Sequence, residues 1–184
     1  MNSMNVLDAL VNWLKIEYQG YQLPNKGGVM QQVNIYAQYT PQPDGITYTD
    51  KARKGLAGYE SADYESVFPC IVVRLGECTD TEEGAPSQST VNVKLLTGIY
   101  DDTKDSQGYR YILAMQEKTR ILLLEHRVID KKYILQMPIK SRLLELETWP
   151  VWYGEQDLVF TAGRPLQNWE YIHGDMRPER GMRR

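Results

Sequence analysis

Few side chains in this sequence have the types and spacing that chemistry requires. Its only histidines are His126 and His173, and neither stands at a metal-ligand spacing from the two cysteines, Cys70 and Cys78. His126 falls near the end of a predicted helix, where a histidine interacts favourably with the helix dipole. No glycine-rich phosphate loop is present. The sequence therefore predicts no metal site and no cofactor.

Three acidic residues gather between a predicted strand and a predicted helix, at Asp101, Asp102 and Asp105. They resemble a fragment of a calcium loop, but Gly108 is misplaced and no glutamate stands where the bidentate ligand belongs. A strand end followed by a helix cap explains these acids more simply. The main prediction is a protein that is not an enzyme. The enzymatic alternative is a small hydrolase or nuclease that uses Asp101, Asp102 and His126.

The aromatic composition is unusual, with 13 Tyr and 4 Trp against 2 Phe. Tyr and Trp have apolar bodies and polar tips, which suits surfaces that become buried on association. For Trp149 and Trp152, the competing interpretation is burial within their own subunit. For the arginines near the end of the sequence, the competing interpretation is a frayed, solvated terminus. The candidate interface residues are Tyr36, Tyr39, Tyr48, Trp149, Trp152, Tyr153, Trp169, Arg180, Arg183 and Arg184.

Bulk properties indicate an ordinary globular chain of 184 residues, 42% hydrophobic and 24% charged, with a formal net charge of -3. The charge gives no reason to expect nucleic-acid binding over the whole surface. No apolar run is long enough for a membrane span, and the first 15 residues look like a folded helix rather than a signal peptide. Cys70 and Cys78 fall on or beside one predicted strand and are expected to be reduced thiols, which favours synthesis in the cytoplasm.

Hydrophobic periodicity predicts two helices and four main strands. A strand over residues 29–39 is also plausible, and Pro138 confines its own strand to an edge or a bulge. The predicted helices cover residues 3–18 and 107–127, and the main strands cover 68–77, 89–100, 133–147 and 154–162.

The order of these elements predicts an α+β fold, in which a four-stranded antiparallel sheet packs with the two helices. Strands 68–77 and 89–100 are expected to pair with each other. Residues 20–66 are rich in Gly, Pro, Gln, Asn and Tyr, so they are expected to form a long extended arm. The predicted organisation is one domain over residues 1–165, with the arm inserted, and a C-terminal tail over residues 166–184.

Three stretches of the sequence form a recognisable series: FPCIVVRLGE at 68–77, TVNVKLLTGIYD at 90–101, and QGYR at 107–110. They are followed by WYG at 152–154, before the last strand. This order resembles the tail terminator, or tail completion, proteins of tailed bacteriophages and phage-tail-like particles. The resemblance covers about residues 68–165 and the N-terminal helix.

The resemblance implies an α+β subunit that assembles into a hexameric ring. Such a ring caps the tail tube, ends its polymerisation and joins it to the neck or connector protein. In a contractile tail it also meets the sheath protein. The expected location is the virion tail or neck, after synthesis in the bacterial host cytoplasm, with DNA only passing through the lumen and no membrane partner. Acidic residues could line that lumen, and the candidates are Asp80, Glu82, Glu83, Asp101, Asp102 and Asp105.

Two further alternatives stay open at the level of sequence. One is a head–tail connector or neck protein of the same particle, which the sequence separates poorly from a terminator. The other is a nucleic-acid-binding module that uses its sheet face, for which Lys94 and Tyr100 are the only support.

Overall fold

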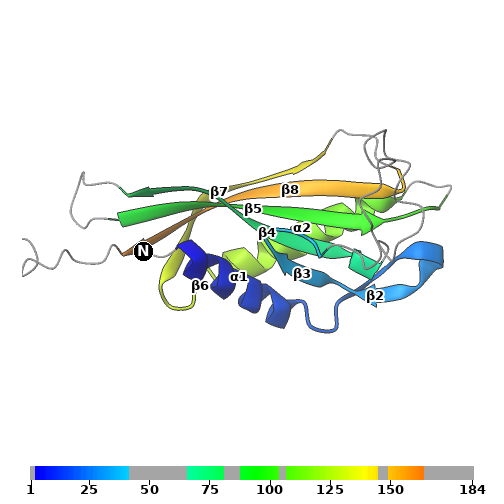
Figure 1. Ribbon diagram of the computed structural model, residues 1–184, viewed down its shortest axis with the longest axis horizontal. Helices are drawn as coiled ribbons and strands as arrows, with labels where there is room; N and C mark the ends of the chain where they lie inside the picture. The colour runs from blue at the N-terminus through cyan, green and yellow to red at the C-terminus, as the bar shows by residue number, and fades with distance from the viewer. Residues whose placement is uncertain (1–2, 42–65, 81–87, 104–106, 145–148, 164–184) are drawn as a thin grey trace, which may run out of the picture.

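Two helices pack against one face of a curled six-stranded sheet (Figure 1). The computed structural model describes residues 3–41, 66–80, 88–103, 107–144 and 149–163. In chain order the elements are α1 (Ser3–Glu17), β1 (Gln22–Pro24), a 3-10 turn η1 (Lys26–Gly28), β2 (Met30–Gln32), β3 (Asn34–Ala37), β4 (Cys70–Asp80), β5 (Gln88–Tyr100), α2 (Gly108–Glu125), β6 (Val128–Ile129), β7 (Tyr133–Leu143) and β8 (Val151–Gly163).

The main sheet has the strand order β3-β4-β5-β8-β7-β6, and β3 and β4 are its parallel pair. The α+β class is confirmed, and β4 pairs with β5 in the antiparallel direction as predicted. The prediction of a four-stranded antiparallel sheet is wrong, because β3 and β6 extend the sheet at its two sides and β3 makes it mixed. Both added strands are short, at four and two residues, so neither carries a clear periodic signal.

The first part of the predicted arm belongs to the main fold. Leu23, Val33 and Ile35 are buried in the main core, and β1 pairs with β2 as a small separate ribbon. The strand predicted over residues 29–39 divides at Val33 into β2 and β3. Residues 42–65, the centre of the predicted arm, lie outside the described residues.

Strand β5 has the alternation that the sequence predicts. Val91, Val93, Leu95 and Ile99 are buried in the core beneath the helices. Residues between them face the other side of the sheet, where Leu96 packs with a second, smaller apolar cluster. That cluster is built on four buried residues, Val67, Phe68, Cys70 and Val72.

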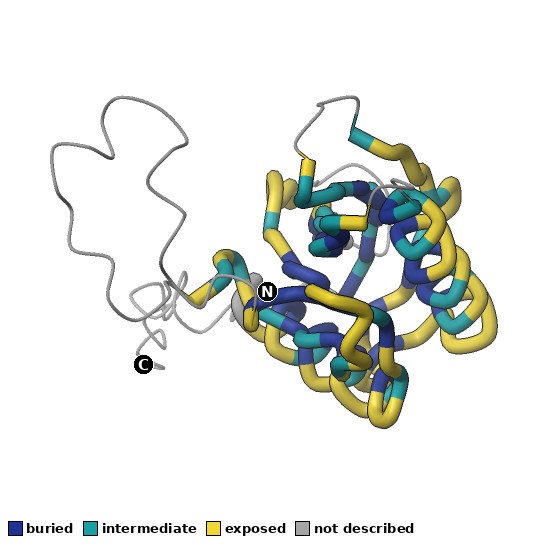
Figure 2. The backbone as a smooth tube through the Cα atoms, turned by 90° about the vertical axis from the view of Figure 1, so that its right-hand side faces the viewer, coloured by how far each residue is buried: buried dark blue, intermediate teal, exposed yellow. Residues whose placement is uncertain are grey.

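The two helices share the coverage of one sheet face. Helix α1 contacts β3, β4 and β6, whereas α2 contacts β5, β8 and β7. Buried segments line the interior between the helices and the sheet, and exposed segments lie outside (Figure 2). On α2 the buried face includes Gln116 and Thr119, while Leu113 and Leu124 are exposed.

Gln116 can be buried because backbone carbonyls of β7 and β8 give its side-chain amide partners. The β7–β8 register shifts between Gln136 and Lys140, around Pro138, so the predicted bulge is confirmed. The Gln116 side-chain amide donates to the carbonyls of Arg142 and Glu155, at 3.1 and 3.2 Å. A buried amide is stable only with such partners, so the packing of α2 depends on the pairing of β7 with β8.

Tyr18, at the end of α1, joins the two helices. Its hydroxyl donates to the Met115 carbonyl at 2.9 Å and lies 2.7 Å from the Thr119 hydroxyl. Burial raises the pKa of Tyr18 far above its ordinary value, so the phenol stays protonated and can donate. The aromatic ring of Tyr21 packs edge-on against it, with ring centroids 5.4 Å apart.

Removing this hydroxyl is expected to weaken the joint between the helices. Tyr18→Phe should lower the free energy of unfolding by about 1–2 kcal/mol, because two buried hydrogen bonds are lost. Urea titration followed by circular dichroism measures the change. Tyr21→Phe is the matched control and should change stability by less than about 0.5 kcal/mol. Equal losses in the two variants would show that the hydroxyl bonds of Tyr18 are not what joins the helices.

Candidate assembly surfaces

The predicted aromatic block and the predicted aspartates meet at one end of the sheet. Tyr100, at the end of β5, lies opposite Val151 at the start of β8. The Asp101 backbone N–H donates to the Pro150 carbonyl at 2.8 Å. We call this end, with Tyr100, Trp149, Trp152 and Tyr153, the aromatic end.

Some aromatic side chains of this end pack against the protein, and others are exposed to solvent. Trp152 is half-buried against the main core, and its ring fills the space beside Gly108, where a β-carbon would collide with it. Tyr153 packs on the opposite face, edge-on to Phe68 with ring centroids 6.1 Å apart. Trp149 is 61% exposed. Of the three, Trp149 is therefore the side chain best placed to contact another molecule.

The candidate interface tyrosines Tyr36 and Tyr39, both in the predicted arm, differ in exposure. Tyr36 is half-buried against the second apolar cluster, and this burial raises its pKa. Tyr39 is 77% exposed, and the Arg74 guanidinium lies 6.0 Å from the centre of its ring. Tyr39 is thus an exposed aromatic residue beside β4. Tyr48, Trp169, Arg180, Arg183 and Arg184 lie outside the described residues.

The candidate lumen acids do not form one cluster. Asp80 ends β4, pairs in register with Ser89 and accepts a hydrogen bond from its hydroxyl, whereas Asp101 follows the opposite end of β5. The 13 residues of β5 separate these ends by about 40 Å. Asp101 is buried and its carboxylate accepts the Thr103 backbone N–H, so it acts locally as a turn cap, next to the half-buried Asp102. Glu82, Glu83 and Asp105 lie outside the described residues.

The three residues of the enzymatic alternative, Asp101, Asp102 and His126, lie far apart in the structure. His126 caps the C-terminal end of α2, as the sequence predicted, and its N–H donates to the Leu122 carbonyl at 2.9 Å. Asp101 and Asp102 precede the other end of this 18-residue helix, about 27 Å away. These three residues therefore cannot share one site. Among the described residues, no group of three or more His, Cys, Asp or Glu side chains could hold a metal ion.

A ladder of charged residues crosses the sheet face opposite the helices. Glu155 on β8 is nearly buried, and it pairs with Lys94 on β5 at 2.9 Å and with Arg142 on β7. Asp157 lies 3.6 Å from the same lysine. Tyr100 packs against the second apolar cluster. Because Lys94 is already neutralised and Tyr100 is half-buried, this face offers little to a nucleic-acid backbone.

The two cysteines are free thiols, as the sequence predicted. Cys70 is buried in the second apolar cluster, and burial raises its pKa to about 12. Such a thiol stays protonated near neutral pH and is unreactive. Cys78 is exposed near the far end of β4.

The sequence matches no protein-family model and no curated protein. No helix in the described part of the chain has the length and apolar character needed to cross a membrane. The surfaces of the molecule therefore carry the functional argument.

Two strand edges are open in the described sheet: one on β7, where the sequence placed Pro138 at an edge or a bulge, and one on β4, which sequence reasoning missed. Beyond Ile134, no described strand pairs with the outer side of β7. Beyond Leu75, none pairs with the outer side of β4, because β3 covers only residues 70–73 and Gln38 contacts the next two. We call these the β7 edge and the β4 edge. No sequence signal marks the β4 edge, because a strand edge is open only through the absence of a neighbour.

The ion pairs of the charged ladder should differ in their contribution to stability. Glu155→Gln should lower the free energy of unfolding by about 1–2 kcal/mol, because a nearly buried carboxylate loses two charged partners. Asp157→Asn, on the same strand and face, should cost less than about 0.5 kcal/mol because its pair is solvated. Chemical denaturation in low salt measures both. A larger loss in Asp157→Asn would overturn this ranking.

Proposed function

We propose that this protein is a tail terminator of a bacteriophage or a phage-tail-like particle. It forms a hexameric ring on the end of the tail tube, where it stops tube growth and joins the tube to the neck or connector protein. In a contractile tail the ring also meets the sheath protein. The proposal starts from the order of sequence stretches over residues 68–165 and takes its structural support from the two open edges.

The observation that carries this proposal is that, among the described strands, the sheet has two open edges of different chemistry. A closed ring is built by one repeated head-to-tail contact, so each subunit needs two unlike surfaces that fit each other. Exposed strand edges are suited to such a contact, because they bind another strand through backbone hydrogen bonds. The β7 and β4 edges lie on opposite sides of the sheet, as a head-to-tail contact requires.

The charges of the two edges are complementary. Strand β7 exposes Lys140 along its free part, where the neighbouring Arg142 is already paired with Glu155, and β4 exposes Glu77 and Asp80 along its own. Opposite charges across an interface favour the correct register and speed association. Charged edge strands also discourage indiscriminate pairing, so these charges suit a contact that forms with one partner edge and no other.

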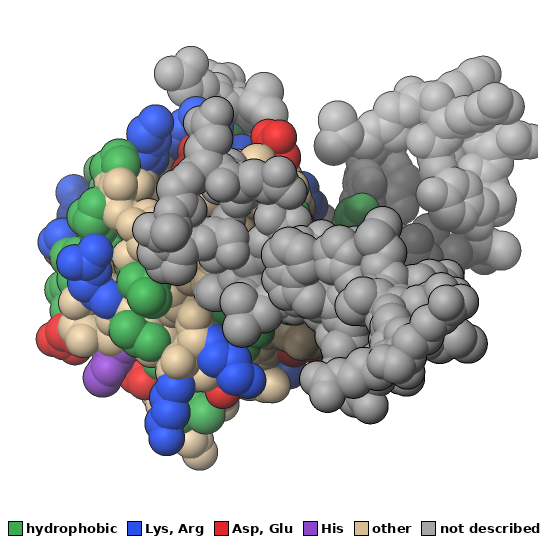
Figure 3. Space-filling view, turned by 90° about the vertical axis from the view of Figure 1, so that its left-hand side faces the viewer, with side chains coloured by type: hydrophobic (Ala, Val, Ile, Leu, Met, Phe, Trp, Pro, Cys, Tyr) green, Lys and Arg blue, Asp and Glu red, His purple; other side chains and the backbone are tan. Residues whose placement is uncertain are grey.

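Exposed apolar side chains accompany the β7 edge. Val128, Ile134 and Met137 are each about half exposed, at 52%, 47% and 53%. From the side of the β6–β7 turn, apolar side chains are seen between basic ones on the described surface (Figure 3). Burying such residues in a subunit contact would stabilise it by about 25 cal/mol for each Å² of apolar surface removed from water.

The function is tested directly on growing tubes. When the purified protein is added to polymerising tail tube protein of the same particle, tubes should be shorter and should carry a ring at one end. Electron microscopy of negatively stained tubes measures both. Tubes of unchanged length with bare ends would contradict the terminator function. Binding to portal or neck complexes without any binding to tubes would instead identify a connector.

Ring formation is tested separately by native mass spectrometry. The unmodified chain, of 21.3 kDa, should form a closed oligomer of six copies. Met137→Glu should shift it towards monomer by at least tenfold in the dissociation constant, because a charge is placed in the apolar part of the contact, at about 1.4 kcal/mol per tenfold. Leu113→Glu on α2, 46% exposed, is the matched control and should leave the oligomer intact. A strictly monomeric parent chain would exclude the ring.

A further inference from the structure

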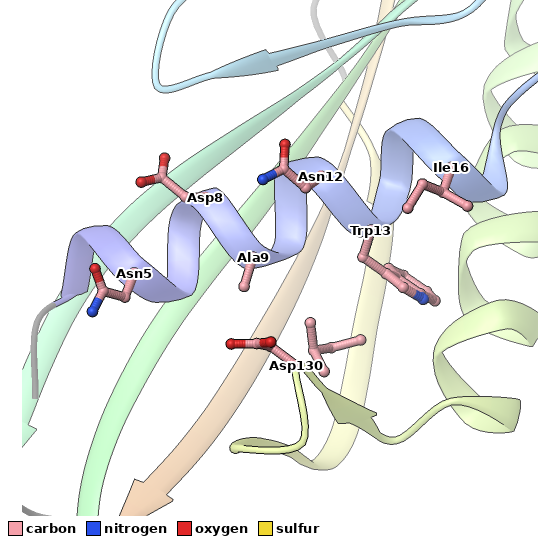
Figure 4. A pocket seen from close by; sticks show the side chains of 8 residues that line it. Asn5, Asp8, Ala9, Asn12, Trp13, Ile16 and Asp130 are labelled. Carbon is pink, nitrogen blue, oxygen red and sulfur yellow. The ribbon is translucent and has the colours of Figure 1, made fainter.

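A groove runs between α1 and the β6–β7 turn. Its volume is about 410 Å³. Helix α1 lines it with Asp8, Ala9, Trp13 and Ile16, and the turn contributes Ile129 and Asp130 (Figure 4). The two elements approach from opposite sides, so the groove is an open channel on the surface rather than a closed cavity.

The groove combines an apolar base with acidic sides. Trp13 is half-buried, with its ring edge-on to His126, and Ile16 is 69% exposed. Asp8 forms no ion pair with the described part of the chain, and Asp130 is held by Lys132 at 3.3 Å. Because Lys132 neutralises part of the charge of Asp130, the carboxylate of Asp8 should attract a cation more strongly than that of Asp130. The chemistry fits a short segment that carries arginines between apolar residues.

The chain leaves the sheet beside this groove. Strand β8 ends at Gly163, and Thr161 pairs in register with Ile134, the second residue of β7. The β6–β7 turn, which forms one wall of the groove, therefore lies next to the last residues of β8. A segment that follows β8 begins close to the groove.

The end of the sequence has the composition that the groove requires. Residues 177–184 read RPERGMRR, with four arginines against one glutamate, a formal charge of +3. From Gly163 to Arg177 there are 14 residues, which can span up to about 46 Å when extended. That reach exceeds the length of α1, about 22 Å for its 15 residues, so every part of the groove is accessible.

We propose that residues 177–184 bind in the α1–turn groove of their own chain. The arginines pair with Asp8 and Asp130, and the arginine stems and Met182 cover Trp13 and Ile16. This contact does not depend on ring formation, because both partners belong to one subunit.

Site-specific photocrosslinking of the full-length chain tests this contact. A benzoylphenylalanine at Asn12, which lines the groove, should crosslink to residues 177–184, and mass spectrometry of the digest identifies the partner. The same probe at Leu113, exposed on α2, is the control and should not reach those residues. A mixture of unlabelled and nitrogen-15-labelled protein distinguishes crosslinks within one chain from crosslinks between two chains. Crosslinks within one chain support the proposal, whereas crosslinks only between chains, or only to other segments, overturn it.

A charge exchange tests the proposed ion pairs. Asp8→Arg should lower the yield of the Asn12 crosslink by about twofold to fivefold, as expected for the loss of one exposed ion pair. Adding Arg180→Glu and Arg183→Glu to Asp8→Arg should restore the yield. Glu17→Arg, on the same helix but outside the groove, is the matched control and should have no effect. If Asp8→Arg leaves the yield unchanged, the charge-paired contact is wrong.

Discussion

The uninterrupted pairing of β5 with β8 is the constraint on which the rest of the structure depends. All 13 residues of β5 pair with β8 in one register, from Gln88 opposite Gly163 to Tyr100 opposite Val151. A shift of one residue would turn every core side chain of one strand to the opposite face. The helices, the second apolar cluster and the charged ladder all use this register.

The same pairing determines where small and polar residues must stand. At Gly154 a β-carbon would come within 2.6 Å of the Gln116 amide, and at Gly98 it would come within 2.7 Å of the Phe68 ring. The two glycines thus let α2 approach one face of the sheet and the second apolar cluster approach the other. Thr97, between these positions, satisfies its buried hydroxyl by donating to the Gly154 carbonyl at 3.0 Å. Close packing on both faces therefore follows from a few residues of the central pair.

The sequence predicted the elements whose pattern is local and missed those that depend on distant partners. Helices α1 and α2 and the four long strands carry clear periodicity, and Pro138 marked its bulge. The parallel pairing of β3 with β4 joins segments more than 30 residues apart in sequence, and four residues are too few for a periodic signal. Gln116 looked like an interruption of an apolar stripe because its partners are carbonyls of another element.

For the candidate assembly surfaces, too, the sequence identified candidate residues but not which of them are exposed. Trp149 and Trp152 were equivalent in sequence, but Gly108 makes room for the ring of Trp152, while Trp149 remains exposed. Whether an aromatic residue packs inward depends on a small residue elsewhere, which composition cannot reveal.

The two open edges raise a related question, which is whether the sheet could close on itself by pairing β4 with β7. In the strand order β4-β5-β8-β7, three gaps of about 4.8 Å separate the two edges, so they lie about 14 Å apart along the sheet. Both helices occupy the face towards which the sheet would have to close into a barrel. Because that face is filled, the β4 and β7 edges do not pair with each other among the described strands, and a strand that completes either edge must come from residues beyond those described or from another chain.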